Sequence, residues 1–179
     1  MINEDFDLDK MNDIDWTDTF ADSDDNAIND KIREFIDRYV EIVYMNMSWR
    51  NVYVTPSFVI TADGKVELRM PDGEPLSNNV TVRIQNKDMD SRFIKPREPF
   101  GSIKDMLCGM SLADMPDNNF NVINMDIEHL YGLPDSVGGL CISKCASLDD
   151  LSGIPKNVNG DLRLHLYQWT RVNTMPERI

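Results

Sequence analysis

The stretch LPDSVGGLCISKCASLDDLSGIPKNVNGDLRL, residues 133–164, carries the same pattern twice. Pro155 stands 21 positions after Pro134, and each proline is followed three residues later by valine and five residues later by glycine. After each glycine, apolar residues alternate with other residues, as in a β-strand that buries one face. The stretch therefore predicts two equivalent strands, one in each repeat.

The repeat extends beyond this stretch. Four pentapeptides end in proline, namely LADMP at 112–116, LYGLP at 130–134, LSGIP at 151–155 and VNTMP at 172–176. Pro96 and Pro75 continue nearly the same spacing backwards, although the residues before them match poorly. We count five units from Pro75. A unit of about 20 residues cannot enclose a core alone, so its neighbours must be stacked on it.

The segment LCISKCASL at 140–148 resembles the L-x-L-x-x-N/C-x-L segment of leucine-rich repeats. Residues 130–176 resemble short repeats in uncharacterised proteins of tailed bacteriophages and some bacteria. The resemblance implies a curved solenoid that binds other macromolecules. Tyr167 stands where asparagine or cysteine would be expected, and residues 96–115 contain a weak strand and a helical turn.

The elements before the repeats complete the predicted fold. An apolar stripe with three- and four-residue spacing predicts an amphipathic helix over residues 26–45. Residues 51–61 and 65–70 predict a hairpin around Asp63-Gly64, and residues 80–84 predict a further strand. We expect an α+β fold in which the helix and hairpin cap a leucine-rich-repeat-like β solenoid with a parallel sheet. Its parts would be an acidic flexible tail (1–24), the capping elements (25–74) and the solenoid (75–179).

Acidic charge is concentrated at the N-terminus. The chain carries a formal charge of −13, and its first 30 residues contain eleven Asp or Glu against one lysine. Such a distribution argues against a nucleic-acid-binding surface and favours a protein partner with a basic surface. Trp16 and Phe20 are among the apolar residues interleaved with these aspartates, a pattern typical of tails that become ordered on binding.

No residue pattern demands catalysis. Cys141, Cys145 and His165 are conceivable zinc ligands, but the two-residue thiolate spacing and a second pair are absent. The repeat explains Cys145 better as a turn residue whose thiol contacts backbone groups. Phosphate-binding, dinucleotide-binding and nucleophile-elbow motifs are also absent. We expect no catalytic, cofactor or metal site, and no enzyme.

The function expected from these features is binding. The main hypothesis is a phage protein that binds a host protein and inhibits or redirects it. The alternatives are an acidic nucleic-acid mimic, which blocks a DNA- or RNA-binding host defence enzyme or polymerase, and a structural component of a virion. The expected partner-binding residues are Trp16, Phe20, Arg163, His165 and Tyr167, whereas Trp169 aligns with Leu148 and is expected in the core.

The remaining expectations concern location and assembly. Apolar runs are too short for a membrane span, and the acidic N-terminus is unlike a secretion signal. Three irregularly spaced cysteines favour a reducing compartment. We therefore expect a soluble protein in the cytoplasm, that of the bacterial host if it is phage-encoded. A homodimer would close the C-terminal edge of the solenoid.

Overall fold

The computed structural model describes residues 16–86 and 101–178, with side chains described for 26–86 and 101–177. Helix α3 (Trp16–Tyr39) leads directly into strand β1 (Val40–Met45). The predicted helix over residues 26–45 is therefore wrong in its last part. Val40 and Ile42 alternate with partly exposed residues and are fully buried, because β1 pairs with strands on both of its edges. This pairing overrides the helical spacing of the apolar residues.

Two predicted segments fall partly outside the described residues. Of the predicted acidic tail (1–24), residues 1–15 lie outside them, and the rest forms the first turns of α3. The repeat unit that begins at Pro96 is described only from residue 101 onward.

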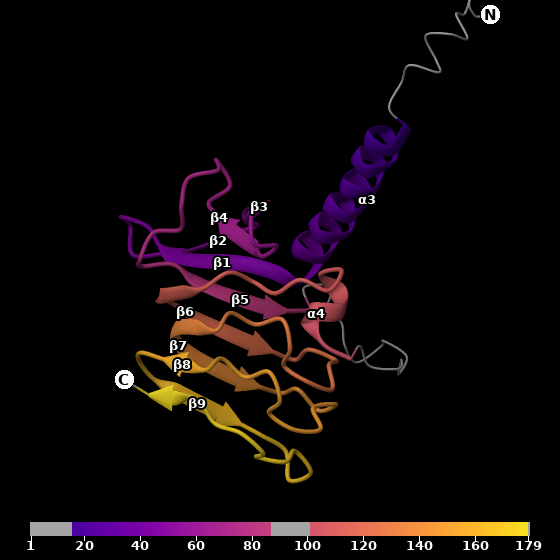
Figure 1. The fold of residues 1–179 in the computed structure, drawn as a ribbon. Helices are drawn as coiled ribbons and strands as arrows, with labels where there is room; N and C mark the ends of the chain where they lie inside the picture. The colour runs from indigo at the N-terminus through magenta and orange to yellow at the C-terminus, as the bar shows by residue number, and fades with distance from the viewer. Residues whose placement is uncertain (1–15, 87–100, 179) are drawn as a thin grey trace, which may run out of the picture.

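One sheet of eight strands organises the fold (Figure 1). Its other strands are β2 (Asn51–Val54), β5 (Thr81–Gln85), β6 (Met115–Ile123), β7 (Ser136–Ser143), β8 (Asn157–Val158), β9 (Leu162–His165) and β10 (Glu177–Arg178). The strand order is β10-β8-β7-β6-β5-β1-β2, and β9 also pairs with β7. Figure 1 shows the C-terminal strands at the end of the sheet farthest from α3.

The predicted fold class, a parallel-sheet solenoid capped by a helix and a hairpin, is wrong. The sheet is mixed, because β1 pairs antiparallel with both β2 and β5, whereas β5, β6, β7, β8, β9 and β10 are joined by parallel pairings. The N-terminal strands therefore extend the sheet itself instead of closing one end of it. The physical reason is that β1 carries apolar residues that continue the buried face of β5, with Ile42 opposite Val82.

The predicted hairpin is present but forms a separate two-stranded sheet. It consists of β3 (Ser57–Ile60) and β4 (Val66–Arg69), and Gly64 in its turn has a φ of 80°. The predicted strand over 51–61 is interrupted at Pro56, because proline has no N–H to donate and restricts the residue before it. Its first half becomes β2 of the main sheet. β4 is held to the rest of the fold by a hydrogen bond from the Val66 N–H to the Ser111 carbonyl, at 2.9 Å.

The 21-residue spacing of the repeats matches the parallel pairing of β7 with β8, because residues 21 positions apart lie opposite each other. Val137 on β7 lies opposite Val158 on β8, and both are fully buried. Outside the strands, backbone hydrogen bonds join successive repeats: the Asp149 N–H donates to the Glu128 carbonyl, 21 positions earlier, and the Arg171 N–H donates to the Asp149 carbonyl, 22 positions earlier. One continuous apolar core runs from Ile32 on α3 to Val158. The short helix α4 (Ile103–Met106), whose N-cap is Ser102, adds buried Ile103 to this core.

None of the described helices combines the length and apolar character needed to cross a membrane.

Candidate binding surface on the sheet

The main sheet buries one face and leaves the other open. On β5, β6 and β7 the buried face includes Val82, Ile84, Phe120, Val122, Leu140 and Ile142. The residues that alternate with them point to the opposite side. Three of them continue a row that begins on β1 and ends on β9. The row consists of Glu41, Arg83, Asn121, Cys141 and Arg163, each opposite the next in register. We call the surface made by this row and by the neighbouring Asn119 the open face.

A shallow hollow of about 310 Å³ lies in the open face. It forms where β7 contributes Gly139 between the side chains of β6 and β9. A methyl group added to Gly139 would come within 2.5 Å of the Asn119 Oδ1 atom, so the glycine leaves room for the asparagine side chain. The hollow is lined by Thr81, Asn119, Asn121, Gly139, Leu140, Cys141, Asp161 and Arg163.

The two asparagines of the hollow keep their hydrogen-bonding groups available. Among the described residues, the side-chain amides of Asn119 and Asn121 make no hydrogen bond, whereas that of buried Asn118 donates to the carbonyls of Ser77 and Val80, at 2.8 and 2.9 Å. An amide offers both donors and an acceptor. The open face therefore presents a pair of amides that can bind polar groups of a ligand or a protein.

Charged side chains flank these amides. Arg83 lies 3.3 Å from Glu41 and stacks over the ring of Tyr53 at 5.6 Å. Its Nε is buried and makes no hydrogen bond within the described part of the chain. Arg163, three strands away and hence about 14 Å from Arg83 at the usual strand spacing, lies 3.6 Å from Asp161. The amides thus lie between two guanidinium groups, each beside a carboxylate.

The structure places three of the predicted partner-binding residues near this surface. Arg163 and His165 alternate along β9 and are both exposed. Tyr167 follows the strand, is exposed, and stacks on Trp169 with ring centroids 4.8 Å apart. Trp16 and Phe20 lie within the backbone of α3, but their side chains fall outside the described residues.

The prediction of Trp169 in the core is wrong, because its side chain is exposed, with its ring stacked on Tyr167 and its indole N–H donating to the Ala146 carbonyl at 2.8 Å. Sequence reasoning also missed Arg83, Asn119, Asn121 and Gly139 as parts of one surface. The strict alternation after Pro75 was a signal for Arg83. No repeat pattern marked the asparagines of β6.

The three residues considered for zinc do not converge. Cys145 is buried, and its thiol contacts the backbone carbonyls of Val122 and Ser143 at 3.9 and 3.5 Å, which confirms the predicted contact with backbone groups. Burial raises the pKa of the Cys145 thiol. Cys141 lies on the open face and His165 pairs with Ser143, one row further along. Across the described residues, no group of three His, Cys, Asp or Glu side chains is arranged to hold a metal ion.

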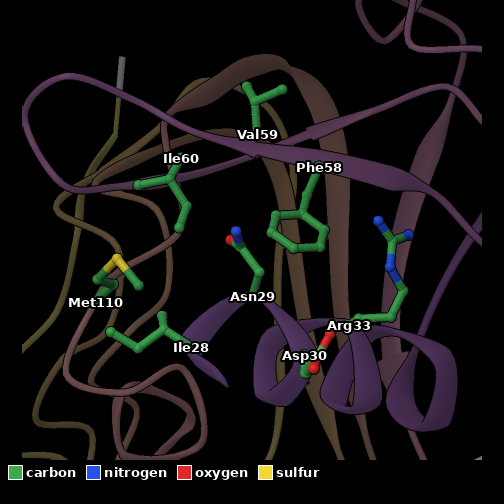
Figure 2. Close-up of a pocket in the computed structure, with 8 residues that line it drawn as sticks. All are labelled: Ile28, Asn29, Asp30, Arg33, Phe58, Val59, Ile60 and Met110. Atoms are coloured by element: carbon green, nitrogen blue, oxygen red, sulfur yellow. The ribbon is translucent and has the colours of Figure 1, made fainter. Parts of the chain in front are cut away.

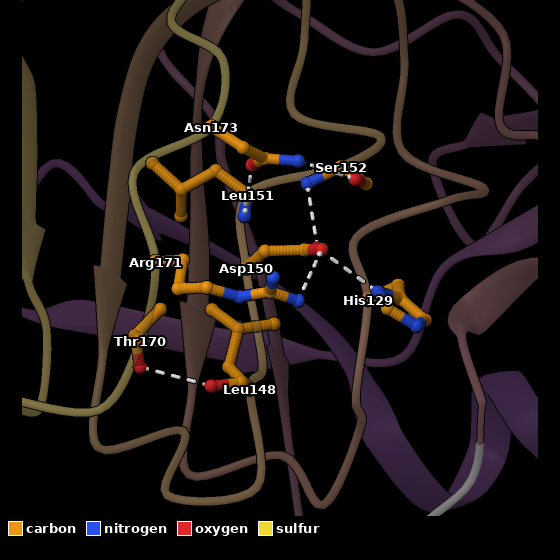
Figure 3. A network of polar contacts seen from close by, with 8 residues as sticks. All are labelled: His129, Leu148, Asp150, Leu151, Ser152, Thr170, Arg171 and Asn173. Atoms are coloured by element: carbon orange, nitrogen blue, oxygen red, sulfur yellow. Dashed lines mark hydrogen bonds and ion pairs between the residues drawn. The ribbon is translucent and has the colours of Figure 1, made fainter.

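On the loop side of the sheet, three residues at equivalent positions of successive repeats form a polar ladder (Figure 3). The Nδ1–H of His129 donates to the Asp150 carboxylate at 2.9 Å, and Arg171 approaches the same carboxylate at 3.6 Å. The Ser152 backbone N–H also donates to Asp150, at 3.0 Å. Burial raises the pKa of Asp150, but the hydrogen bonds from His129 and Ser152 outweigh this and lower it. The ladder joins successive layers, so we assign it a structural role.

A larger cavity, of about 680 Å³, lies between α3 and β3 (Figure 2). Its walls are mainly apolar, with Ile28, Phe58, Val59, Ile60 and Met110. The guanidinium of Arg33 lies 4.8 Å above the Phe58 ring. This charged group of the cavity is therefore already engaged in a contact within the fold. Asp30 and Asn29 complete the lining. Within the described part of the chain, this cavity therefore has fewer converging polar groups than the open face.

Comparisons with known proteins add no relative. No protein-family model matches the chain, and neither a curated protein nor a solved structure matches it.

Proposed function

We propose that this protein is a non-enzymatic binding module that recognises a protein partner through the open face. The observation that carries the proposal is the pair of amides on Asn119 and Asn121, which make no hydrogen bond among the described residues and lie in a hollow with Arg83 on one side and Arg163 on the other. Polar groups on a sheet surface that make no bond within the fold are available for intermolecular hydrogen bonds. Arginine is enriched at the energetically important positions of protein interfaces.

The chemistry of the partner follows from two parts of the chain. The open face offers amide and guanidinium donors, which suit backbone carbonyls and carboxylates of an extended segment. The eleven acidic residues among the first 30 favour a partner whose remaining surface is basic. A partner with an acidic or polar segment beside a basic surface would satisfy both.

The experiment is affinity capture from a bacterial lysate with three forms of the full chain. These are the wild type, the open-face variant Asn119→Ala/Asn121→Ala, and the control Asn26→Ala/Asn29→Ala. All four asparagines are exposed or half-buried, and the control pair lies on α3, so both variants should fold. The proposal expects a stoichiometric partner with the wild type and the control, and its loss with the open-face variant. Equal recovery with all three forms, or no partner for the wild type, would refute it.

A second candidate function is motivated by charge alone. The acidic N-terminal residues resemble a polyanion, so the chain would occupy the basic cleft of a nucleic-acid-binding enzyme as a mimic. Removing residues 1–15 eliminates six of the eleven acidic residues and leaves α3 intact. If mimicry is the function, this deletion abolishes binding and the open-face variant does not. If the open face is the site, the opposite pattern results.

A further inference from the structure

The C-terminal end of the sheet, formed by residues 160–178, exposes apolar side chains at positions that are buried one layer earlier. Trp169, Val172 and Met175 are 60%, 60% and 52% exposed. The residues 21 positions before them are buried, at 0%, 0% and 7%: Leu148, Leu151 and Ile154. Each earlier residue is covered by the layer that follows it. In the described structure no further layer covers the C-terminal end, so its apolar side chains are exposed to solvent.

The strand at this end also has an unpaired edge. β9 pairs with β7 along one edge, and no strand in the described ranges pairs with the other. An unpaired edge is a template for another strand. Exposed apolar side chains beside such an edge mark an interaction surface.

The distribution of charge indicates that a second copy of the chain can approach this end of the sheet. The chain as a whole carries −13, so two copies repel each other over most approaches. Residues 160–179 are different, because they contain three arginines against two acidic residues and hence a formal charge of +1. Within β9 and the residue before it, Asp161 and Arg163 have opposite charges, lie on the same side of the strand and are 82% and 68% exposed.

We propose that a second copy of this chain covers the C-terminal end. The two β9 strands pair edge to edge and antiparallel about a twofold axis at Leu162. This register places Asp161 of each copy opposite Arg163 of the other, at a spacing where cross-strand ion pairs form. The exposed Trp169, Val172 and Met175 of one copy then pack near those of the other, as a self-complementary interface requires. The pairing joins the two open faces into one continuous surface.

The first test is the mass of the full chain in solution by light scattering, over a concentration range from micromolar to millimolar. The wild type should approach twice 20.6 kDa. Val172→Glu/Met175→Glu should raise the dissociation constant of the dimer at least about tenfold, because it buries charge at the apolar contact. Met47→Glu is the matched control, since Met47 is 99% exposed in the turn between β1 and β2. A wild type that stays at 20.6 kDa throughout, or a Val172→Glu/Met175→Glu variant that dimerises like it, overturns the proposal.

The second test examines the register with charge reversals, which leave the fold intact because both side chains are exposed. Asp161→Arg places like charges opposite each other in the dimer, and so does Arg163→Asp. Each should weaken dimerisation about threefold to tenfold. The double reversal restores opposite charges and should recover the affinity of the wild type. Two single variants without effect, or a double variant as weak as the single ones, would overturn pairing about Leu162.

Discussion

Val137 and Val158 occupy the same position in successive repeats and lie opposite one another on the parallel strands β7 and β8, each with a fully buried side chain. The same interval relates the residues of the loop-side ladder, His129, Asp150 and Arg171. A repeat in the sequence is thus a layer in the structure. Each layer covers the apolar side chains of the layer before it, and this determines where substitutions are costly.

Leu151→Ala and Val172→Ala test this covering directly, because the two residues occupy the same position in successive layers. Leu151 is fully buried and Val172 is 60% exposed. Leu151→Ala should lower the free energy of unfolding by about 2–5 kcal/mol, from lost burial and the cavity left behind. At a protein concentration where the chain is monomeric, Val172→Ala should change it by less than about 0.5 kcal/mol. Urea denaturation followed by circular dichroism measures both, and similar losses for the two variants would contradict the layered core.

Gly153→Ala tests the tight approach between layers. Gly153 has a φ of 90°, and a methyl group there would collide with the backbone of Leu130 and Tyr131 in the preceding layer. Gly73 has the same φ, but a methyl group there would meet no atom within 4 Å. Gly73→Ala should therefore cost only the backbone strain of about 1 kcal/mol, whereas Gly153→Ala should cost at least about 3 kcal/mol. Thermal unfolding of the two variants distinguishes strain alone from strain with collision.

His129→Ala should make the fold more sensitive to acid. Burial acts to raise the pKa of Asp150 in the folded state, but hydrogen bonds from His129 and Ser152 lower it overall. A lowered folded pKa stabilises the fold above the pKa of the unfolded carboxyl, and this contribution is lost as the pH falls through the folded pKa. Removing His129 lets the pKa of Asp150 rise, so the midpoint of acid unfolding should move to higher pH. His165→Ala, at an exposed position on β9, is the control and should leave the midpoint unchanged.

Gly139→Ala and Gly138→Ala distinguish the effect of the hollow on partner binding from an effect on the stability of the fold. A methyl group on Gly139 would displace only the Asn119 side chain among its closest contacts, so it should fill the hollow at a cost below about 1 kcal/mol. A methyl group on Gly138 meets the backbone of Asn118 at 3.0–3.1 Å and should cost about 1–3 kcal/mol. We expect Gly139→Ala to weaken partner binding and keep the unfolding temperature. A Gly139→Ala chain that binds like the wild type would remove the hollow from the site.

Sequence reasoning worked where one local pattern determines the structure. The turn at Asp63-Gly64, the strand after Pro75 and the register of the repeats all depend on residues within a few positions of each other or on an interval visible in the sequence. It failed at β1. Val40 and Ile42 fit a helix as well as a strand by spacing, and only their pairing with β5, much later in the chain, decides between the two.

The candidate site was predictable only in part. Alternation along Leu162–His165 predicted that Arg163 and His165 face outward. The asparagines of β6 could not be found in this way, because β6 has a register irregularity between Met115 and Asn119 and its alternation is masked by neighbouring polar residues. The exposure of Trp169 was missed for a related reason. Its alignment with Leu148 is real, but burial depends on a following layer that the alignment does not supply.

The open face as the site of recognition is tested most directly by the rate at which Cys141 reacts with a thiol-alkylating reagent, with and without the captured partner. Cys141 is half-buried on the open face, Cys108 is exposed near α4, and Cys145 is buried. If the partner covers the open face, a saturating amount should slow alkylation of Cys141 at least about tenfold, because the thiolate must be accessible to react, while Cys108 keeps its rate. An unchanged rate at Cys141 in the saturated complex would contradict the account.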